Sequence, residues 1–343
     1  MQQSSGSNIL LELRAREAFM RRRYDQALEI AQEAAALASN RGDTAAWWQM
    51  TFLRGESFRE QGLYEECKVV AEELREHPLT AASPALKARV LTMLSVASQI
   101  VGALPEAIEL ATEALQLDQS DDQATALRIE AELALIAALA GNDQLDHAWH
   151  ECVSLTELLD LEPDSQVAGK AYWAIGNVAF LRQRPGDGVK YHRLAAEHLS
   201  PTNDLALWAW FNRASAAMRL AAEVADDETY ECIQRAELAT SIVGGNEADL
   251  LHVEFIKGHW LFLKADYSAA VDVLRQVAAK APRLANHITG DALLLLGRGL
   301  GGTGDSSAGL DILQQSEKWF TEAGAIDRAA QAAALVSEMQ ASH

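Results

Sequence analysis

A helical-hairpin motif that recurs about every 40 residues constrains this chain more than any other feature of its sequence. In the clearest copy, an apolar helix ends at a corner around Gly102, and a second helix follows with Ile108, Ala111 and Leu115 on one face. Neither helix can bury its apolar face alone, so each hairpin must stack on further copies of itself. The second helices of eight hairpins are predicted to begin at Tyr24, Tyr64, Leu104, Leu145, Pro185, Thr229, Tyr267 and Ser306.

Small residues recur at fixed distances from these starts. The third residue beyond each start is always Ala, Cys or Gly, the size required where two helices cross closely. A second small position lies in the first helix, nine residues before the start, although Ile136 breaks the rule and the sixth copy is out of phase. The residues that follow this second rule are Ala15, Gly55, Ser95, Gly176, Gly258 and Gly297. We therefore predict close helix packing at both positions.

Length and composition agree with an all-α repeat array. The chain has 343 residues, more than the roughly 250–300 that one compact core usually organises. It contains only 7 prolines and almost no runs of Val, Ile and Thr, while 49% of its residues are hydrophobic. We predict a flexible tail over residues 1–8, a repeat domain over 9–323, and a C-terminal capping helix and tail over 324–343.

The corners of the hairpins resemble the tetratricopeptide repeat (TPR), in which a Gly-Asp-Tyr-type corner is followed by Ala. The best matches are residues 265–270 (Ala-Asp-Tyr-Ser-Ala-Ala), residues 62–67 (Gly-Leu-Tyr-Glu-Glu-Cys) and Gly304-Asp305. The period exceeds the family standard of about 34 residues, and such longer repeats are similar to the sensor domains of bacterial transcriptional regulators and peptide-pheromone receptors. The resemblance implies a right-handed α-solenoid of about eight hairpins, whose first helices line a concave groove for peptides or extended protein segments.

The net charge of −20 bears on the choice of partner. Phosphates are repelled by an acidic surface, so we expect neither direct nucleic-acid binding nor membrane binding. The same charge favours a basic or apolar segment of a peptide or protein partner. Cys67, Cys152 and Cys232 each replace a small apolar residue of a second helix, which predicts buried, reduced thiols. Together with the lack of a signal-peptide pattern or a long apolar run, this predicts a cytoplasmic protein.

Helical phase, counted from the corners, selects the residues that would face the groove. Asn177 and Asn212 could bond the backbone amides of a bound peptide while neighbouring aromatic rings hold its side chains, and the alternative is that these rings only pack between repeats. The candidate binding residues are Arg89, Lys170, Trp173, Asn177, Phe180, Trp208, Asn212, His252, Phe255 and His259. The same count places further residues on this face, namely Gln49, Phe52, Glu56, Phe262 and Arg298.

No catalytic, cofactor-binding or metal-binding constellation is expected. His147 and His150 with Cys152 offer too few suitable ligands for zinc, and the glycine-rich stretch at 297–302 lacks the ending and the preceding strand of a phosphate loop. The carboxylate clamp of TPR chaperone adaptors is not expected either, because only Asn177 matches its Lys/Asn pattern at the paired groove positions.

The sequence thus predicts a non-catalytic peptide- or protein-binding module that acts as a bacterial regulatory or signalling sensor. The alternative is a scaffold or regulatory subunit that binds a folded partner through its convex or terminal surfaces. That alternative includes self-association into a homodimer.

Overall fold

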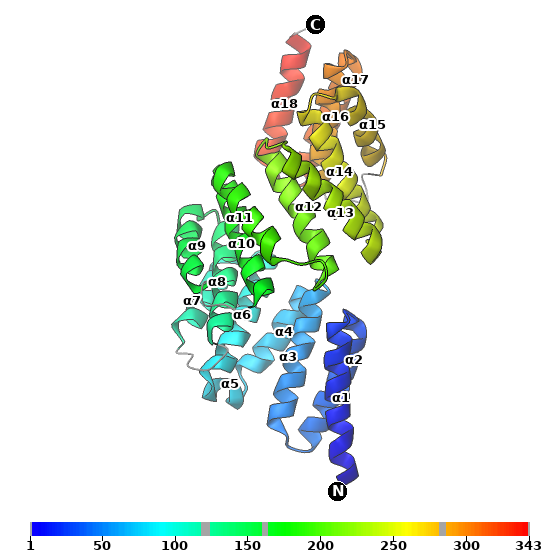
Figure 1. Cartoon of the computed structure of the whole chain (residues 1–343). Helices are drawn as coiled ribbons and strands as arrows, with labels where there is room; N and C mark the ends of the chain where they lie inside the picture. The colour runs from blue at the N-terminus through cyan, green and yellow to red at the C-terminus, as the bar shows by residue number, and fades with distance from the viewer. Residues whose placement is uncertain (1, 118–123, 160–163, 281–285, 342–343) are drawn as a thin grey trace. The chain divides into compact units, whose positions relative to one another are not determined.

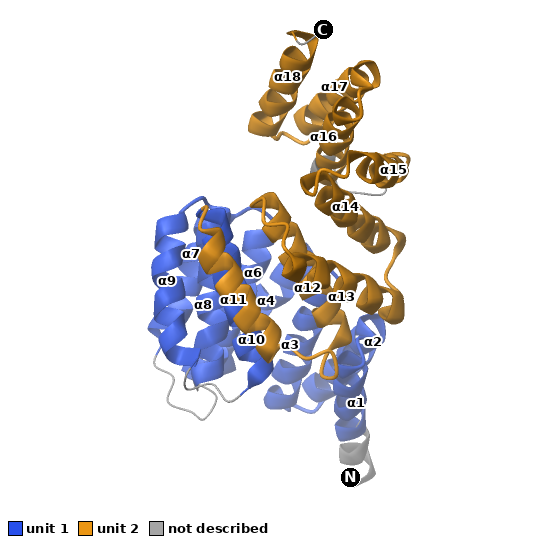
Figure 2. Cartoon of the chain, turned by 45° about the horizontal axis from the view of Figure 1, so that its top comes forward, with its two compact units in different colours: residues 1–182 blue, residues 183–343 orange. Residues whose placement is uncertain are grey.

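The structure is a computed structural model that describes residues 2–117, 124–159, 164–280 and 286–341 (Figure 1). Every regular element within these ranges is a helix, which confirms the all-α prediction. The chain divides into two compact units, unit 1 (Met1–Arg182) and unit 2 (Gln183–His343) (Figure 2).

Both units are built from consecutive helices that pack as hairpins. Unit 1 contains α1 (Gln2–Met20), α2 (Tyr24–Asn40), α3 (Thr44–Glu60), α4 (Tyr64–Arg75), α5 (Pro78–Ala82), α6 (Pro84–Ile100), α7 (Leu104–Gln116), α8 (Ala124–Gly141), α9 (Leu145–Leu159) and α10 (Ser165–Leu181). Unit 2 contains α11 (Pro185–His198), α12 (Leu205–Ala221), α13 (Asp227–Val243), α14 (Glu247–Leu263), α15 (Tyr267–Ala278), α16 (Asn286–Gly302), α17 (Ser306–Glu322) and α18 (Ile326–Ala341).

The second helices of the hairpins begin where the repeat predicts them. The predicted starts of α2, α4, α7, α9, α11, α15 and α17 are confirmed to the residue. The start of α13 at Asp227 differs from the predicted Thr229, because the Asp226 side chain caps the helix by accepting the Thr229 amide proton at 2.9 Å. At the N-terminus the structure extends α1 back to Gln2, into the segment predicted as a tail.

The hairpin corners share one backbone conformation. Two positions before the second helix, a residue adopts the left-handed conformation, with φ of 76° at Gly62, 87° at Gly102 and 91° at Gly304. Glycine adopts this conformation without strain, whereas a side chain makes it costly. The equivalent residues of other hairpins are not glycines: Arg22, Asp143, Gln183 and Ala265.

The two series of small residues lie where helices approach most closely, as predicted. A Cβ atom built on Gly258 of α14 would come within 2.7 Å of the Leu274 side chain of α15. In the next hairpin, a Cβ on Gly309 of α17 would lie 2.8 Å from the carbonyl oxygen of Gly297 of α16. The residues Ala15, Ala27, Cys67, Ser95, Ala107, Ala148 and Ala270 are all fully buried.

The cysteines are buried and form no disulfide, as the sequence predicts. Burial raises the pKa of the Cys67 thiol to about 11 and that of the Cys152 thiol to about 12, so both stay protonated near neutral pH. Over the described residues, none of the helices combines the length and the apolar character that crossing a membrane requires.

Candidate functional site

Helices α12, α14, α16 and α18 of unit 2 enclose a pocket of about 590 Å³, which we call the α14 pocket. It has the size of a small-ligand or side-chain site. Three of the predicted binding residues line it, namely His252, Phe255 and His259, and so do Phe262 and Arg298. Their shared position follows from helical phase, because residues 252, 255, 259 and 262 repeat at three- and four-residue intervals on one face of α14.

The wall formed by α14 is an aromatic row. The Phe255 ring lies between the two imidazoles, with its centroid 6.2 Å from that of His252 and 6.2 Å from that of His259. Phe255 is 9% exposed and belongs to the main apolar core of unit 2, whereas both histidines are half-buried. Leu220 of α12 and Leu295 of α16 complete the apolar lining from the neighbouring helices.

The mouth of the α14 pocket carries two arginines with different surroundings. Arg328 of α18 donates hydrogen bonds to the Asp291 carboxylate of α16 and to Gln331, so its charge is compensated within the pocket. Arg298 is exposed, its guanidinium lies 4.8 Å from the centre of the Phe262 ring, and it has no ion-pair partner among the described residues. The lining therefore carries one arginine without an ion-pair partner among the described residues, Arg298, together with a second carboxylate, that of Glu223.

His259 is uncharged in these surroundings. Burial, and then the positive charges of Arg298 and Arg328, lower the pKa of its imidazole from 6.5 to about 4. A neutral imidazole can donate one hydrogen bond and accept another, which suits a polar but uncharged group of a ligand. The pocket can thus hold an apolar side chain, bond a polar group at His259 and attract an anionic group at Arg298.

The predicted residues of α10 form a separate set in unit 1. Lys170 is exposed, Trp173 and Asn177 are half-buried, and Phe180 is 6% exposed. Their spacing places Trp173, Asn177 and Phe180 along one face of α10. They do not line the α14 pocket, so their role in binding remains a prediction.

Asn212 of unit 2 lies differently from the prediction. Its side chain is 0% exposed, and its amide nitrogen donates a hydrogen bond to the Trp208 carbonyl at 2.8 Å. Trp208 is half-buried and packs on Phe211, with ring centroids 5.9 Å apart. The enclosed side chain corrects the prediction that Asn212 faces the groove. Asn212 lies in the sixth hairpin, which is out of phase with the others, so counting residues from the corner selected the wrong face of α12.

The sequence did not predict that two charged residues, Asp291 and Arg328, line the α14 pocket. Asp291 and Arg328 meet only because α18, which packs on α17, brings Arg328 to α16, and the sequence identified α18 simply as a cap. The remaining predicted residue, Arg89, lines a different pocket in unit 1 together with Gln49, Phe52 and Glu56.

Comparison with known proteins identifies the fold through structure alone. The sequence matches no protein-family model and no curated protein. A Rap protein complexed with competence and sporulation factor is similar over 98% of both chains, with a TM-score of 0.57 and 13% identity. Aspartyl phosphate phosphatase F from Bacillus subtilis is similar over 92% of this chain and 74% of its own, with a TM-score of 0.52 and 14% identity.

A third similar structure carries the repeat in its description. It is a signal-transduction ATPase with numerous domains and a tetratricopeptide repeat sensor, from Pyrococcus horikoshii, matched with a TM-score of 0.63 and 12% identity. The match covers 96% of this chain and 50% of that one. The chain is an all-α solenoid of TPR type. The TPR-type hairpins predicted from the corner residues are therefore confirmed at the level of the fold.

Proposed function

We propose that this TPR-type chain is a non-catalytic binding module that holds a peptide or an extended protein segment, and that the α14 pocket receives one of its side chains. The observation that carries the proposal is the convergence of His252, Phe255, His259, Phe262 and Arg298 on one cavity of about 590 Å³. Apolar walls with a few polar groups at fixed positions are typical of ligand sites. The complex of the similar Rap protein with competence and sporulation factor supports the same class of function.

A regulatory or signalling role would follow from the same geometry. The pocket is assembled from four helices, including the terminal α18, so a ligand in it would contact elements that are far apart in sequence. Such a ligand would connect α18, which packs on α17, to the pocket walls formed by α14 and α16. We propose that this is how binding is transmitted to the C-terminal end of the chain.

Filling the α14 pocket tests the proposal. Ala221 lies at its lining and is exposed, so Ala221→Trp places an indole in the cavity without disturbing the core. Affinity purification from native lysate, followed by mass spectrometry of bound peptides and proteins, should show a partner that this variant holds about tenfold more weakly than the wild type. Ala334→Trp, at an exposed position of α18 outside the pocket lining, is the matched control.

The alternative of a scaffold that binds through its terminal surfaces predicts a different result. Helix α18 is largely exposed, and Ile326 at its start is 80% exposed. If a terminal surface is the binding site, the Ala221→Trp protein will capture the same partner as the wild type, and removal of residues 325–343 will abolish capture. That pair of outcomes would contradict binding in the α14 pocket and would support a scaffold that binds through its terminal surface.

A further inference from the structure

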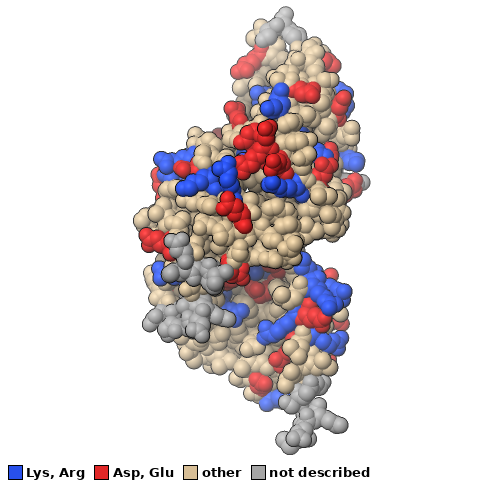
Figure 3. Space-filling view, in the orientation of Figure 1, with Lys and Arg blue, Asp and Glu red and all other residues tan. Residues whose placement is uncertain are grey.

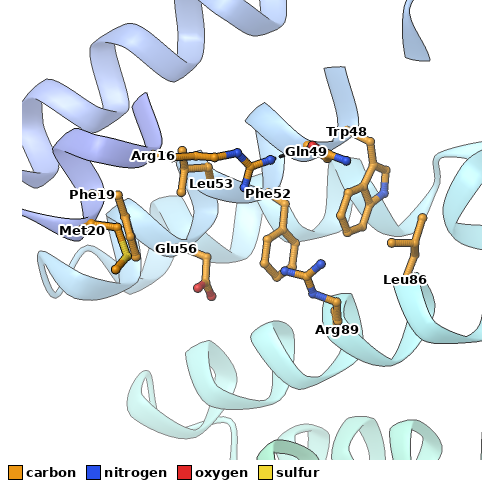
Figure 4. A pocket seen from close by; sticks show the side chains of 10 residues that line it. All are labelled: Arg16, Phe19, Met20, Trp48, Gln49, Phe52, Leu53, Glu56, Leu86 and Arg89. Atoms are coloured by element: carbon orange, nitrogen blue, oxygen red, sulfur yellow. Dashed lines mark hydrogen bonds between the residues drawn. The ribbon is translucent and has the colours of Figure 1, made fainter. Parts of the chain in front are cut away.

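A second pocket, in unit 1, has a different chemistry from the first. It measures about 470 Å³, lies between α1, α3 and α6, and is called here the α3 pocket (Figure 4). Its floor is a stacked pair of nearly buried rings, called here the Trp48–Phe52 shelf, whose centroids lie 5.1 Å apart at an interplanar angle of 10°. The indole nitrogen of Trp48 donates to the Thr80 hydroxyl at 2.8 Å, so the polar group of the shelf is already satisfied and only apolar ring surface faces the pocket.

The guanidinium of Arg89 of α6 lies over this shelf. Its guanidinium carbon is 4.2 Å from the centre of the Phe52 ring and 5.8 Å from that of Trp48. Stacking on an aromatic face fixes the plane of a guanidinium and leaves the N–H groups at its edge directed sideways. An edge of two parallel N–H donors matches the two oxygens of a carboxylate.

Arg16 of α1 supplies a second cation from the other side. Its side chain is exposed and reaches toward the shelf, where its terminal nitrogen donates to the Gln49 side-chain oxygen at 2.6 Å (Figure 4). Neither Arg16 nor Arg89 forms an ion pair with any carboxylate of the described residues. In a chain with 49 acidic and 29 basic residues, two such arginines lining one pocket are a local reversal of the net charge.

The carboxylate that lines the pocket does not cancel this reversal. Glu56 forms an ion pair with Arg59 at 3.0 Å, and Arg59 also contacts Glu60 at 3.3 Å. Burial raises the pKa of the Glu56 carboxyl, and the nearby positive charges of Arg59 and Arg89 reduce this rise without cancelling it. Because Glu56 already has a cationic partner, the donors of Arg16 and Arg89 remain available to a ligand.

We infer that the α3 pocket is a second binding site, which takes a peptide segment carrying a carboxylate next to a large apolar side chain. The apolar group would pack against Phe19 and the exposed Met20, which line the pocket from α1, and the carboxylate would accept hydrogen bonds from Arg89 and Arg16. Polyanions such as nucleic acid fit less well, because red acidic groups lie beside the blue basic groups on the face shown in Figure 3 and the net charge of −20 repels polyanions. The inference rests on the proposed function only in taking the ligand to be a peptide, and it uses none of the residues of the α14 pocket.

Selection of phage-displayed random short peptides on the full chain tests this inference. We expect the selected peptides to be enriched in Asp or Glu beside a large apolar residue, and a synthetic peptide of this kind to bind at least about tenfold more tightly than its Gln-for-Glu version. The double variant Arg16→Gln/Arg89→Gln should abolish that preference, and Arg89→Lys should weaken it, since lysine lacks the planar fork. Circular dichroism of each variant checks that the helices are intact.

Two controls separate this site from its surroundings and from the α14 pocket. Arg14→Gln removes an exposed arginine of α1 that does not line the α3 pocket, and it should leave the enrichment unchanged. Ala221→Trp blocks the α14 pocket, so loss of acidic peptides in that variant would assign them to the other site. The inference is overturned if the selected peptides lack acidic residues, if no peptide is selected, or if the double variant of Arg16 and Arg89 retains the preference for Glu over Gln.

Discussion

At the scale of single residues, the two pockets use the same pairing of an arginine with an aromatic ring. Arg298 lies over Phe262 in the α14 pocket, and Arg89 lies over Phe52 in the α3 pocket. In both cases the ring holds a guanidinium that has no carboxylate partner among the described residues. An aromatic face stabilises a cation without neutralising it, so each pocket keeps a charge that a ligand can use.

Burial, and after it the positive charge of Arg298, lowers the proton affinity of His259, which gives a measurable consequence. The imidazole has a pKa of about 4 in the folded chain and about 6.5 when unfolded, so the unfolded state takes up a proton first as the pH falls. The contribution of His259 to stability is therefore complete above about pH 6.5 and is lost between about pH 6.5 and 4, by about 3 kcal/mol. An NMR titration of the His259 ring and urea unfolding at both ends of this range measure the effect.

Variants identify the cause of this shift. Arg298→Gln should raise the pKa of His259 only in part, because burial is the larger cause. His259→Phe should remove this component of the pH dependence of unfolding, whereas His150→Gln, at an exposed position of α9, should preserve it. A His259 ring that titrates near 6.5 in the wild type would contradict the assigned environment.

At the scale of helices and corners, the hairpins repeat one geometry with unequal residues. The left-handed corner position holds glycine at residues 62, 102 and 304, but alanine at 265. The alanine has φ of 59°, which costs an L-residue about 1–2 kcal/mol that glycine avoids. The corner geometry is therefore imposed by the packing of α14 on α15, and not by the preference of Ala265.

Ala265→Gly should stabilise unit 2. The expected gain is about 0.5–1 kcal/mol, because relief of the strained φ exceeds the extra backbone entropy of glycine in the unfolded chain. Thermal or urea unfolding, compared with the wild type, measures it. The reverse change at an equivalent corner, Gly62→Ala, is the matched control and should destabilise unit 1 by a similar amount, so a neutral result at both corners would contradict the account.

Close approach between α16 and α17 predicts a stronger effect of the opposite sign. In Gly309→Ala, the new Cβ would lie 2.8 Å from the Gly297 carbonyl oxygen, and a backbone atom cannot yield as a flexible side chain does. Overpacking of this kind costs about 1–3 kcal/mol, which exceeds the gain of up to about 1 kcal/mol that alanine brings to a helix. Urea unfolding should show a net loss of stability.

Gly186 provides the comparison for this substitution. It also lies in a helix of unit 2, but a Cβ there meets nothing within 4 Å. Gly186→Ala should therefore be neutral or slightly stabilising. Equal effects of the two substitutions would show that helix propensity, rather than the contact between α16 and α17, decides the outcome.

At the scale of the whole molecule, the sequence predicted what depends on local spacing. The period placed seven second helices at their observed first residues, and helical phase placed His252, Phe255 and His259 on one face of α14. Both results follow because a corner and the helix after it are determined by a few neighbouring residues. The binding role of these residues remains a proposal.

The sequence could not predict contacts that depend on how distant helices pack. Arg328 joins the α14 pocket because α18 packs against α17 and reaches Asp291 of α16, a contact 37 residues apart in the chain. Asn212 was assigned to the groove by counting through a hairpin whose insertion shifts the phase, and the structure encloses its side chain instead. In both cases the missing information was the rotation of one helix about its axis relative to the next.

The terminal helix α18 gives a prediction for the molecule as a repeat array. It covers a small apolar core in which Leu294, Leu313 and Phe320 are each no more than 2% exposed. Removal of residues 325–343 exposes this core, and in a repeat array each hairpin is stabilised chiefly by its neighbours. We therefore expect amide hydrogen exchange to accelerate in α16 and α17 while α3 and α4 keep their protection. The single substitution Leu313→Ala, in the same core, should reproduce the local loss without removing Arg328, which separates capping from the role of α18 in the α14 pocket. Uniform loss of protection along the chain would instead mean that the hairpins unfold as one cooperative body.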